Sequence, residues 1–376
     1  MKIPFHVPVY DEHDAAALAQ VIASGSLVGD GPATRRATTF LAGALGVRHA
    51  LLTPSCTHAL ELAMMCLAIE PGDDVIVPSF TFVSSTNAIL RRGARVAFAD
   101  IDPVTLTLTP EQVTAHLGPR TRAIMPVVYA GISPDMDPIM AIAGPRSITV
   151  VEDAAQGIGA RYRGRPAGTT GHMGCYSFHE TKNFSTGEGG AFVTNDDDLI
   201  LRAEILREKG TNRKQFMLGL VDKYTWVDAG SSFLPPDSMA ALLESQLAKR
   251  AYVQSRRQAI HDRYSGAFRG LAVRGVLALP VIPSYAESNY HIYHVLMESE
   301  TVRNRALAFF RERGIGTTFH YLPLHLSPMG RAMGYGEGDF PVTESVSGRL
   351  LRLPIYPSLT DDQQAAVIRT MEDLFA

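Results

Sequence analysis

Lysine is scarce in this chain of 376 residues: only six of its 35 basic residues are lysine. Cysteine is scarcer, with three scattered positions whose odd number argues against a disulfide framework and whose spacing does not suit zinc. The 38 acidic residues nearly balance the basic ones, so we expect neither a nucleic-acid-binding surface nor one for anionic membranes. No metal site is predicted.

Long apolar runs are also missing. No stretch approaches the roughly 18 apolar residues that a membrane span requires, and the start, MKIPFHVPVYDEHD, lacks the continuous apolar segment of a secretory signal. Hydrophobic residues nevertheless make up 46% of the chain, which excludes disorder as its main state. We therefore expect a globular cytoplasmic protein with no membrane partner.

Short runs of valine and isoleucine alternate with amphipathic segments from residue 33 to residue 200. Such runs indicate a mostly parallel sheet covered on both faces, the α/β class. The predicted strands in this region are Asp74–Val77, Arg95–Ala99, Arg122–Tyr129 and Ser147–Val151. A long helix is predicted from Pro236 to about Phe268, and the pattern changes after it. We place a domain boundary inside that helix, with a large domain over 1–250 and a smaller one over 251–376.

Three segments place chemically useful residues where ligands bind in such sheets, beyond the carboxyl ends of strands. Asp153 follows an apolar strand, and Cys56 and Thr57 join a strand end to a helix start whose free N–H groups suit a phosphate. Taken alone, the Asp153 segment is explained equally well by helix capping, and capping is the favoured explanation of the Cys56–Thr57 segment. The third segment holds Lys182 among aromatic, hydroxyl and glycine residues, whereas the other lysines lie in charged or polar surroundings.

A lysine, a phosphate cradle and an acid that faces a ring nitrogen are together what pyridoxal 5'-phosphate (PLP) requires. Lys182 would form the covalent link, since its surroundings would lower the pKa of its amine. Asp153 would keep the ring nitrogen protonated, and the Ser177 hydroxyl would join the phosphate site. Phe82, which follows another strand, would cover one face of the ring. The combination predicts PLP as the cofactor.

The same residues resemble the PLP-dependent nucleotide-sugar aminotransferases of the DegT/DnrJ/EryC/StrS type, which have the aspartate aminotransferase fold. The most specific signal is Glu-Asp-Ala-Ala-Gln at 152–156, followed by Lys182 within Ser-Phe-His-Glu-Thr-Lys and then by Gly-Glu-Gly-Gly. The resemblance implies that Lys182 binds the cofactor and moves protons, that Asp153 pairs with the ring nitrogen, and that Gln156 contacts the ring oxygen. It also assigns the phosphate to Cys56, Thr57 and Ser177, and the stacking to Phe82.

Within this family the chain is most similar to dTDP-4-amino-4,6-dideoxygalactose transaminases, in stretches such as Leu-Thr-Pro-Ser-Cys-Thr and Phe-His-Tyr-Leu-Pro-Leu-His. This similarity implies transfer of an amino group from L-glutamate to C4 of dTDP-4-keto-6-deoxyglucose. The candidate substrate contacts are Arg213, Tyr224, Trp226, His320 and Tyr321. A solvated loop would explain the first three equally well, and loop packing is favoured over metal binding for His320.

One departure from the family concerns Gly230-Ser231-Ser232-Phe233-Leu234, where many members have Gly-Tyr-Asn-Tyr-Arg. The family's asparagine reaches the phosphate of the partner subunit's cofactor, and the shorter Ser232 stands in its place. The resemblance thus implies a homodimer with active sites at the subunit interface.

Several alternatives stay open at this point. A sugar 3-aminotransferase would use the same core, and a sugar dehydratase of the family would carry histidine where this chain has Lys182. A nicotinamide-dependent oxidoreductase would rest on Gly157-Ile158-Gly159, although Tyr162 replaces the third glycine of that fingerprint. A regulator without activity would keep the fold alone. The configuration of the product at C4 is not determined.

Overall fold

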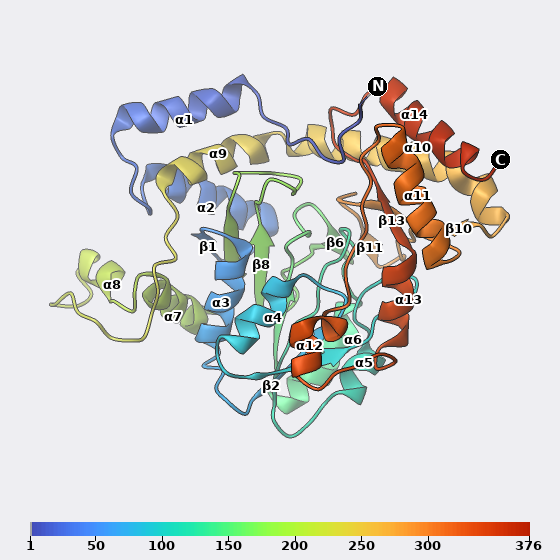
Figure 1. Cartoon of the computed structure of the whole chain (residues 1–376). Helices are drawn as coiled ribbons and strands as arrows, with labels where there is room; N and C mark the ends of the chain where they lie inside the picture. Colours follow the sequence, from blue (N-terminus) through green and yellow to red (C-terminus); the bar gives the residue numbers. More distant parts are fainter. Residues whose placement is uncertain (1) are drawn as a thin grey trace.

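The computed structural model describes residues 2–376 around a central seven-stranded sheet, in the order β1-β9-β8-β5-β4-β2-β3 (Figure 1). Its strands are β1 (His49–Thr53), β2 (Asp74–Pro78), β3 (Arg95–Ala99), β4 (Thr121–Ile124), β5 (Thr149–Asp153), β8 (Met173–Ser177) and β9 (Gly190–Thr194). The strands from β3 to β8 pair in parallel, and only β9 runs antiparallel to its neighbours β1 and β8. The prediction of a mostly parallel α/β sheet is confirmed.

Helices cover both faces of this sheet, because alternate residues of its strands are apolar in both directions. In β2, for example, Val75 and Val77 pack into one layer and Ile76 into the opposite one. The first layer contains α3 (Cys56–Cys66), α4 (Val83–Leu90) and α7 (Asp197–Arg207). The opposite layer contains α2 (Pro32–Leu45), α5 (Pro110–Ala115), α6 (Met136–Ala143), which a 3₁₀ turn (Gly144–Arg146) follows, and α9 (Asp237–Ala248).

A second, three-stranded sheet forms the C-terminal part of the molecule. Its strands β10 (Leu277–Ala278), β12 (Tyr293–Met297) and β13 (Leu350–Leu353) pack with α10 (Arg250–Val273), α11 (Glu300–Glu312) and α14 (Asp361–Asp373). Ile3, from the opposite end of the chain, is buried in this same core. The boundary near residue 250 stays a prediction, and the first residues of the chain lie with the C-terminal sheet.

The remaining elements lie at the periphery or beside the second sheet. They are α1 (Glu12–Ser24), α8 (Arg213–Met217), α12 (Pro328–Ala332), α13 (Pro341–Arg349), the 3₁₀ turn Leu324–Leu326, and the short strands β6 (Arg161–Tyr162), β7 (Arg165–Pro166) and β11 (Ala286–Glu287). None of the helices within residues 2–376 is both long and apolar enough to cross a bilayer.

Two predicted elements differ from the structure. The single helix expected from residue 236 is broken at Lys249, whose backbone leaves the helical conformation and whose ammonium pairs with Asp11 and Asp14. The strand expected over 122–129 ends at Ile124, shortly before Pro126, which has no N–H to offer a neighbouring strand. The helix is thus broken at a residue held by a tertiary contact, and the strand ends near a residue without a hydrogen-bond donor. In both cases the apolar pattern of the sequence continues further.

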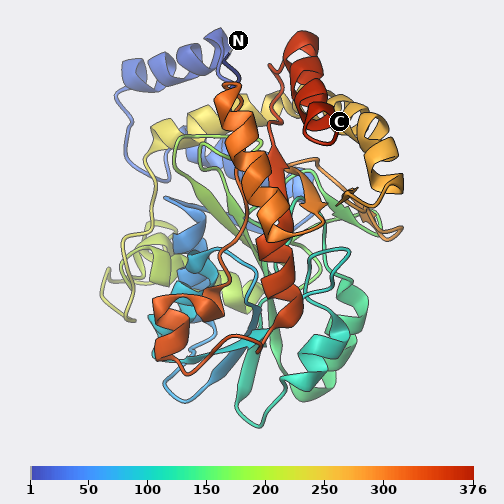
Figure 2. The ribbon, with the colours of Figure 1, turned by 45° about the vertical axis from the view of Figure 1, so that its right-hand side comes forward.

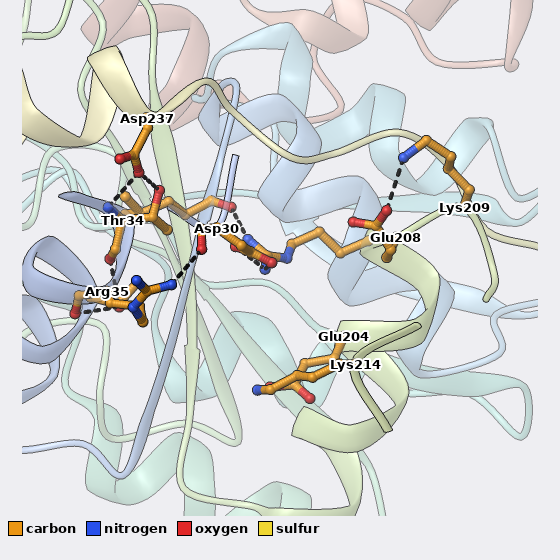
Figure 3. A network of polar contacts seen from close by, with 11 residues as sticks. Asp30, Thr34, Arg35, Glu204, Glu208, Lys209, Lys214 and Asp237 are labelled. Atoms are coloured by element: carbon orange, nitrogen blue, oxygen red, sulfur yellow. Dashed lines mark hydrogen bonds and ion pairs between the residues drawn. The ribbon is translucent and has the colours of Figure 1, made fainter. Parts of the chain in front are cut away.

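Residues 208–232, called the lobe below, project from the sheet domain beside α7 and carry α8 at their far end (Figures 1 and 2). Two isolated bridges, Glu208 with Ser232 and Thr211 with Trp226, hold its two edges together. The base of the lobe is fixed by Arg207, whose Nη2 donates to both carboxylate oxygens of Asp30, at 2.7 and 2.8 Å. Figure 3 shows Asp30 and, at the start of the lobe, the ion pair between Lys209 and Glu208. Arg207 is buried, and it also donates to the Leu52 carbonyl oxygen at 3.0 Å.

Candidate active site

A cavity of about 340 Å³ opens beyond the carboxyl ends of β1, β2, β5 and β8. It brings together nine predicted site residues: Cys56, Thr57, Phe82, Asp153, Gln156, Ser177, Lys182, His320 and Tyr321. A larger cavity, of about 1160 Å³, lies between α1 and α9 and is lined by none of the predicted residues. The chemistry predicted from the sequence therefore converges on the smaller cavity.

Lys182 is half-buried in the wall of this cavity, on the turn that connects β8 to β9. Its backbone N–H donates to the His179 carbonyl oxygen at 2.9 Å, which fixes the start of its side chain. Burial lowers the pKa of the Lys182 amine, although the nearby Cys56 and Asp153 oppose this shift. The amine is thus deprotonated more readily than a free lysine, as a nucleophile at this place requires.

Asp153 ends β5 and is buried, with both carboxylate oxygens held. The Ser85 hydroxyl donates to its Oδ2 at 2.6 Å, and the Ala155 N–H donates to its Oδ1 at 3.1 Å. The Ser85 hydroxyl in turn lies 2.9 Å from the Thr81 hydroxyl. Burial raises the pKa of Asp153, so a cation beside it, such as a protonated ring nitrogen, would stabilise its ionised form.

The N-terminus of α3 forms the cradle predicted for a phosphate. Ser55 caps the helix by accepting the His58 N–H, while the N–H groups of Cys56 and Thr57 meet no acceptor within residues 2–376. Gly190 makes this arrangement possible, since a Cβ there would lie 2.4 Å from the Cys56 nitrogen. Two free donors at the positive end of a helix dipole fit a phosphate group.

Thr57, Ser177 and Phe82 line the cavity beside Lys182, Asp153 and the phosphate cradle. The Thr57 hydroxyl lies 2.7 Å from that of Ser84, and the Ser177 hydroxyl accepts the His179 N–H at 3.3 Å. Phe82 is 58% exposed, as a ring that is available to cover a planar ligand should be. PLP fits this site, because the site combines an amine (Lys182), a carboxylate (Asp153), a phosphate cradle (the N-terminus of α3) and an exposed aromatic ring (Phe82).

Gln156, Tyr321 and His320, which also line the cavity, form a connected group. Gln156 accepts the Ala130 N–H at 2.7 Å and donates to the Tyr321 hydroxyl at 3.0 Å. The Tyr321 ring stacks on His320 with centroids 4.1 Å apart. Burial and the adjacent Arg352 charge lower the pKa of His320 to about 2, so its ring is neutral and its Nε2 accepts from the Arg352 guanidinium.

Four other predicted residues do not line the cavity. Arg213, Tyr224, Trp226 and Ser232 all lie on the lobe. Trp226 is 75% exposed and Tyr224 is 53% exposed in this single chain. Their roles, including that of Ser232 toward a partner subunit's cofactor, stay predictions.

Sequence reasoning missed the cavity residues Arg352, Phe5 and His6, and also Ser85, which does not line the cavity but holds Asp153. Arg352 lies on β13, and burial lowers the pKa of its guanidinium. No Asp or Glu within residues 2–376 pairs with this half-buried guanidinium, nor with the more deeply buried Arg257, which does not line the cavity. The sequence contained one indication that Arg352 is a functional residue: it is a charged residue within the otherwise apolar run Leu350–Tyr356.

The Gly157-Ile158-Gly159 stretch can also be assigned. It forms turns that lead into the short strand β6, whereas a dinucleotide fingerprint must open a helix. The structure therefore gives no support to the nicotinamide alternative.

The fold and the site define a PLP-dependent transferase of fold type I, and comparison with known proteins gives its family. The model of the DegT/DnrJ/EryC1/StrS aminotransferase family matches residues 8–372, and the chain belongs to this family. PLP is its cofactor, and the family and its structural neighbours make it a sugar aminotransferase.

Three relatives illustrate the match. The spore coat polysaccharide biosynthesis protein SpsC of Bacillus subtilis is 33% identical over 99% of this chain and 97% of its own. The aminotransferase TlmJ from Streptoalloteichus hindustanus is 33% identical, with a TM-score of 0.91 over 100% and 99% of the two chains. Spr1654 from Streptococcus pneumoniae, classed as a sugar aminotransferase and solved in a PLP form, is 26% identical, with a TM-score of 0.92 over 100% and 98%.

Proposed function

We propose that the protein transfers the amino group of L-glutamate to C4 of dTDP-4-keto-6-deoxyglucose, giving a dTDP-4-amino-4,6-dideoxy sugar. The observation that carries the aminotransferase chemistry is the convergence of Lys182, Asp153 and the free amides of Cys56 and Thr57 on one cavity. The nucleotide sugar and its C4 position are supported by the sequence motifs that include His320 and Tyr321.

Lys182 and Asp153 have different roles in the proposed reaction. PLP, when bound, withdraws electrons from the carbon that carries the amino group and so acidifies its C–H bond. The Lys182 amine takes the proton from this carbon of the donor and later delivers one to the sugar carbon. Asp153, fixed by Ser85, holds the proton on the ring nitrogen, and the α3 N-terminus holds the phosphate.

The position of Arg352 favours an amino donor that carries a carboxylate. Its guanidinium lines the cavity, has no acidic partner within the described chain, and acts electrostatically on Lys182. An arginine fork binds a carboxylate with two parallel hydrogen bonds, which would replace the missing counter-ion. L-Glutamate supplies such a carboxylate next to its amino group.

The lobe supports a homodimer. Eight large apolar or aromatic side chains on it are exposed in a single chain: Phe216, Met217, Leu218, Leu220, Val221, Tyr224, Trp226 and Val227. Exposed apolar area gathered on one segment in this way is typical of an interaction site. We infer that a second copy covers it, which would bring Ser232, Arg213, Tyr224 and Trp226 toward that copy's cavity.

The test is incubation of the PLP-loaded protein with L-glutamate and dTDP-4-keto-6-deoxyglucose, followed by proton NMR of the product. An amine at C4 is expected, and its proton couplings give the configuration. An amine at C3 would identify a 3-aminotransferase, and loss of the C3 hydroxyl would identify a dehydratase. Release of 2-oxoglutarate without an aminated sugar would refute the proposed acceptor.

A further inference from the structure

Residues 3–10, called the strap below, contain no helix and pass beside the cavity, which Phe5 and His6 line. Ile3 bonds through both its N–H and its carbonyl to the backbone of Gly314 and Gly316, at 2.9 and 2.8 Å. This backbone pairing attaches the strap to the loop that follows α11, close to the C-terminal sheet.

Beyond this point the strap is fixed to the loop that carries Lys182. The His6 Nε2–H donates to the Glu180 carbonyl oxygen at 2.7 Å, and the Tyr10 hydroxyl lies 2.8 Å from that of Ser185. Burial lowers the pKa of His6 to about 4, so the ring is neutral. The strap therefore connects the C-terminal sheet with the loop of the reactive lysine.

Phe5 lies between these two attachments and lines the cavity. The carbon at the centre of the Arg352 guanidinium lies 4.8 Å from the centroid of the Phe5 ring. The aromatic ring leaves the N–H groups at the guanidinium edge free to donate, whereas a carboxylate partner would occupy them. One of these groups donates to His320, which fixes the plane of the fork.

Gly316 allows this approach of the strap. A Cβ on Gly316 would lie 2.5 Å from the Phe5 nitrogen and 3.0 Å from the Phe5 Cβ. These distances are too short for non-bonded atoms, so a side chain there would push the strap away from the cavity.

We propose that Phe5 is a positioning residue of the amino-donor subsite, which holds the Arg352 fork toward the donor carboxylate without neutralising it. The inference rests on the proposed function, in which Arg352 receives that carboxylate. It predicts that loss of the ring weakens the donor side of the reaction and leaves the sugar side intact.

The test measures the two half-reactions separately in the PLP-loaded protein. A cation–π contact of about 0.5–2 kcal/mol corresponds to a rise of about 2-fold to 30-fold in the KM for glutamate in Phe5→Leu. The dissociation constant of glutarate, a dicarboxylate with no amino group to react, should rise by the same factor in calorimetry. The KM for the keto sugar should change less than about 2-fold.

Two further variants separate positioning from packing. Phe5→Tyr keeps the aromatic face and should restore glutarate binding, and Gly316→Ala should reproduce the defect of Phe5→Leu. Phe309→Leu is the matched control, because Phe309 on α11 forms another Arg–Phe contact outside the cavity, with Arg313, which directly follows this helix. An equal slowing of both half-reactions in Phe5→Leu, or no recovery in Phe5→Tyr, would overturn the inference. If the unaltered protein fails to react with glutamate, the proposed function fails instead.

Discussion

The cavity and the lobe present two kinds of functional surface in one chain. In the cavity, Asp153 and Lys182 are held by neighbours that the same chain supplies, and nine predicted residues converge there. On the lobe, Trp226 and Tyr224 face solvent, and Arg213 lies on the exposed helix α8. The reactive lysine and its acid thus lie together in one chain, whereas the lobe presents a surface for recognition by a second molecule.

This difference follows from what each surface must do. Shifting the pKa of a lysine or an aspartate requires burial, and burial requires a rigid layered core around the group. Binding a partner or a nucleotide requires exposed aromatic and apolar area that becomes buried only on association. The predictions below test this contrast, in order of decreasing effect.

Replacing Lys182 by Ala should abolish turnover, with a loss of at least about 10³-fold, because no other lysine of residues 2–376 lines the cavity to move the proton. Thermal unfolding should be unchanged within a few degrees. Steady-state release of 2-oxoglutarate measures the effect, and Lys2→Ala, at an exposed position, is the control. Substantial turnover in the Lys182 variant would remove this lysine from the mechanism.

Asp153→Asn should lower kcat by about 10²-fold to 10³-fold, since an amide cannot stabilise a protonated ring nitrogen electrostatically. Ser85→Ala should have a smaller effect, about 10-fold, because it removes one hydrogen bond to the carboxylate. The visible absorption of the bound cofactor, titrated with pH, should shift in both variants. An unchanged titration in Asp153→Asn would contradict its pairing with the ring.

The corresponding change on the lobe, Trp226→Ala, should raise the KM for the nucleotide sugar about 10-fold and weaken self-association, through loss of an exposed aromatic anchor. The glutamate half-reaction should be unaffected. Sedimentation velocity and initial rates provide the measurement. The control is Tyr252→Ala, because Tyr252 is a half-exposed aromatic residue on α10. If Trp226→Ala leaves both the KM and the association state unaltered, the lobe is a solvated loop with no role in recognition.

The smallest expected effect is on stability. Burial lowers the pKa of His294 to about 3, whereas the unfolded chain titrates near 6.5. The unfolded state therefore binds the extra proton first as the pH falls, and stability is lost from pH 6.5 downward, by at most about 1.4 kcal/mol per pH unit. Urea unfolding at several pH values should show a shallower dependence in His294→Leu. His13→Gln, at an exposed position, should keep the original slope, and an equal slope in both variants would exclude the His294 contribution.

The sequence was informative where function depends on neighbours along the chain. A strand end followed by Asp153, a helix start at Cys56 and Thr57, and the isolated Lys182 were all recognisable, because the carboxyl ends of parallel strands meet at one edge. The same locality explains why the α/β class and most strands could be predicted. It also explains the errors at Lys249 and Pro126, where the apolar pattern continued past the end of the element.

Residues that act through distant partners were not recognisable in this way. Phe5 and Arg352 are separated by almost the whole chain, and neither has a local pattern that links it to Lys182. Their contact arises because the strap pairs with Gly314 and Gly316. The scarcity of lysine and the spacing of the motifs thus identified the reactive amine and its cofactor. The folded chain alone determined that the Arg352 guanidinium lies in the cavity without an acidic partner, because charge pairing depends on distance in space.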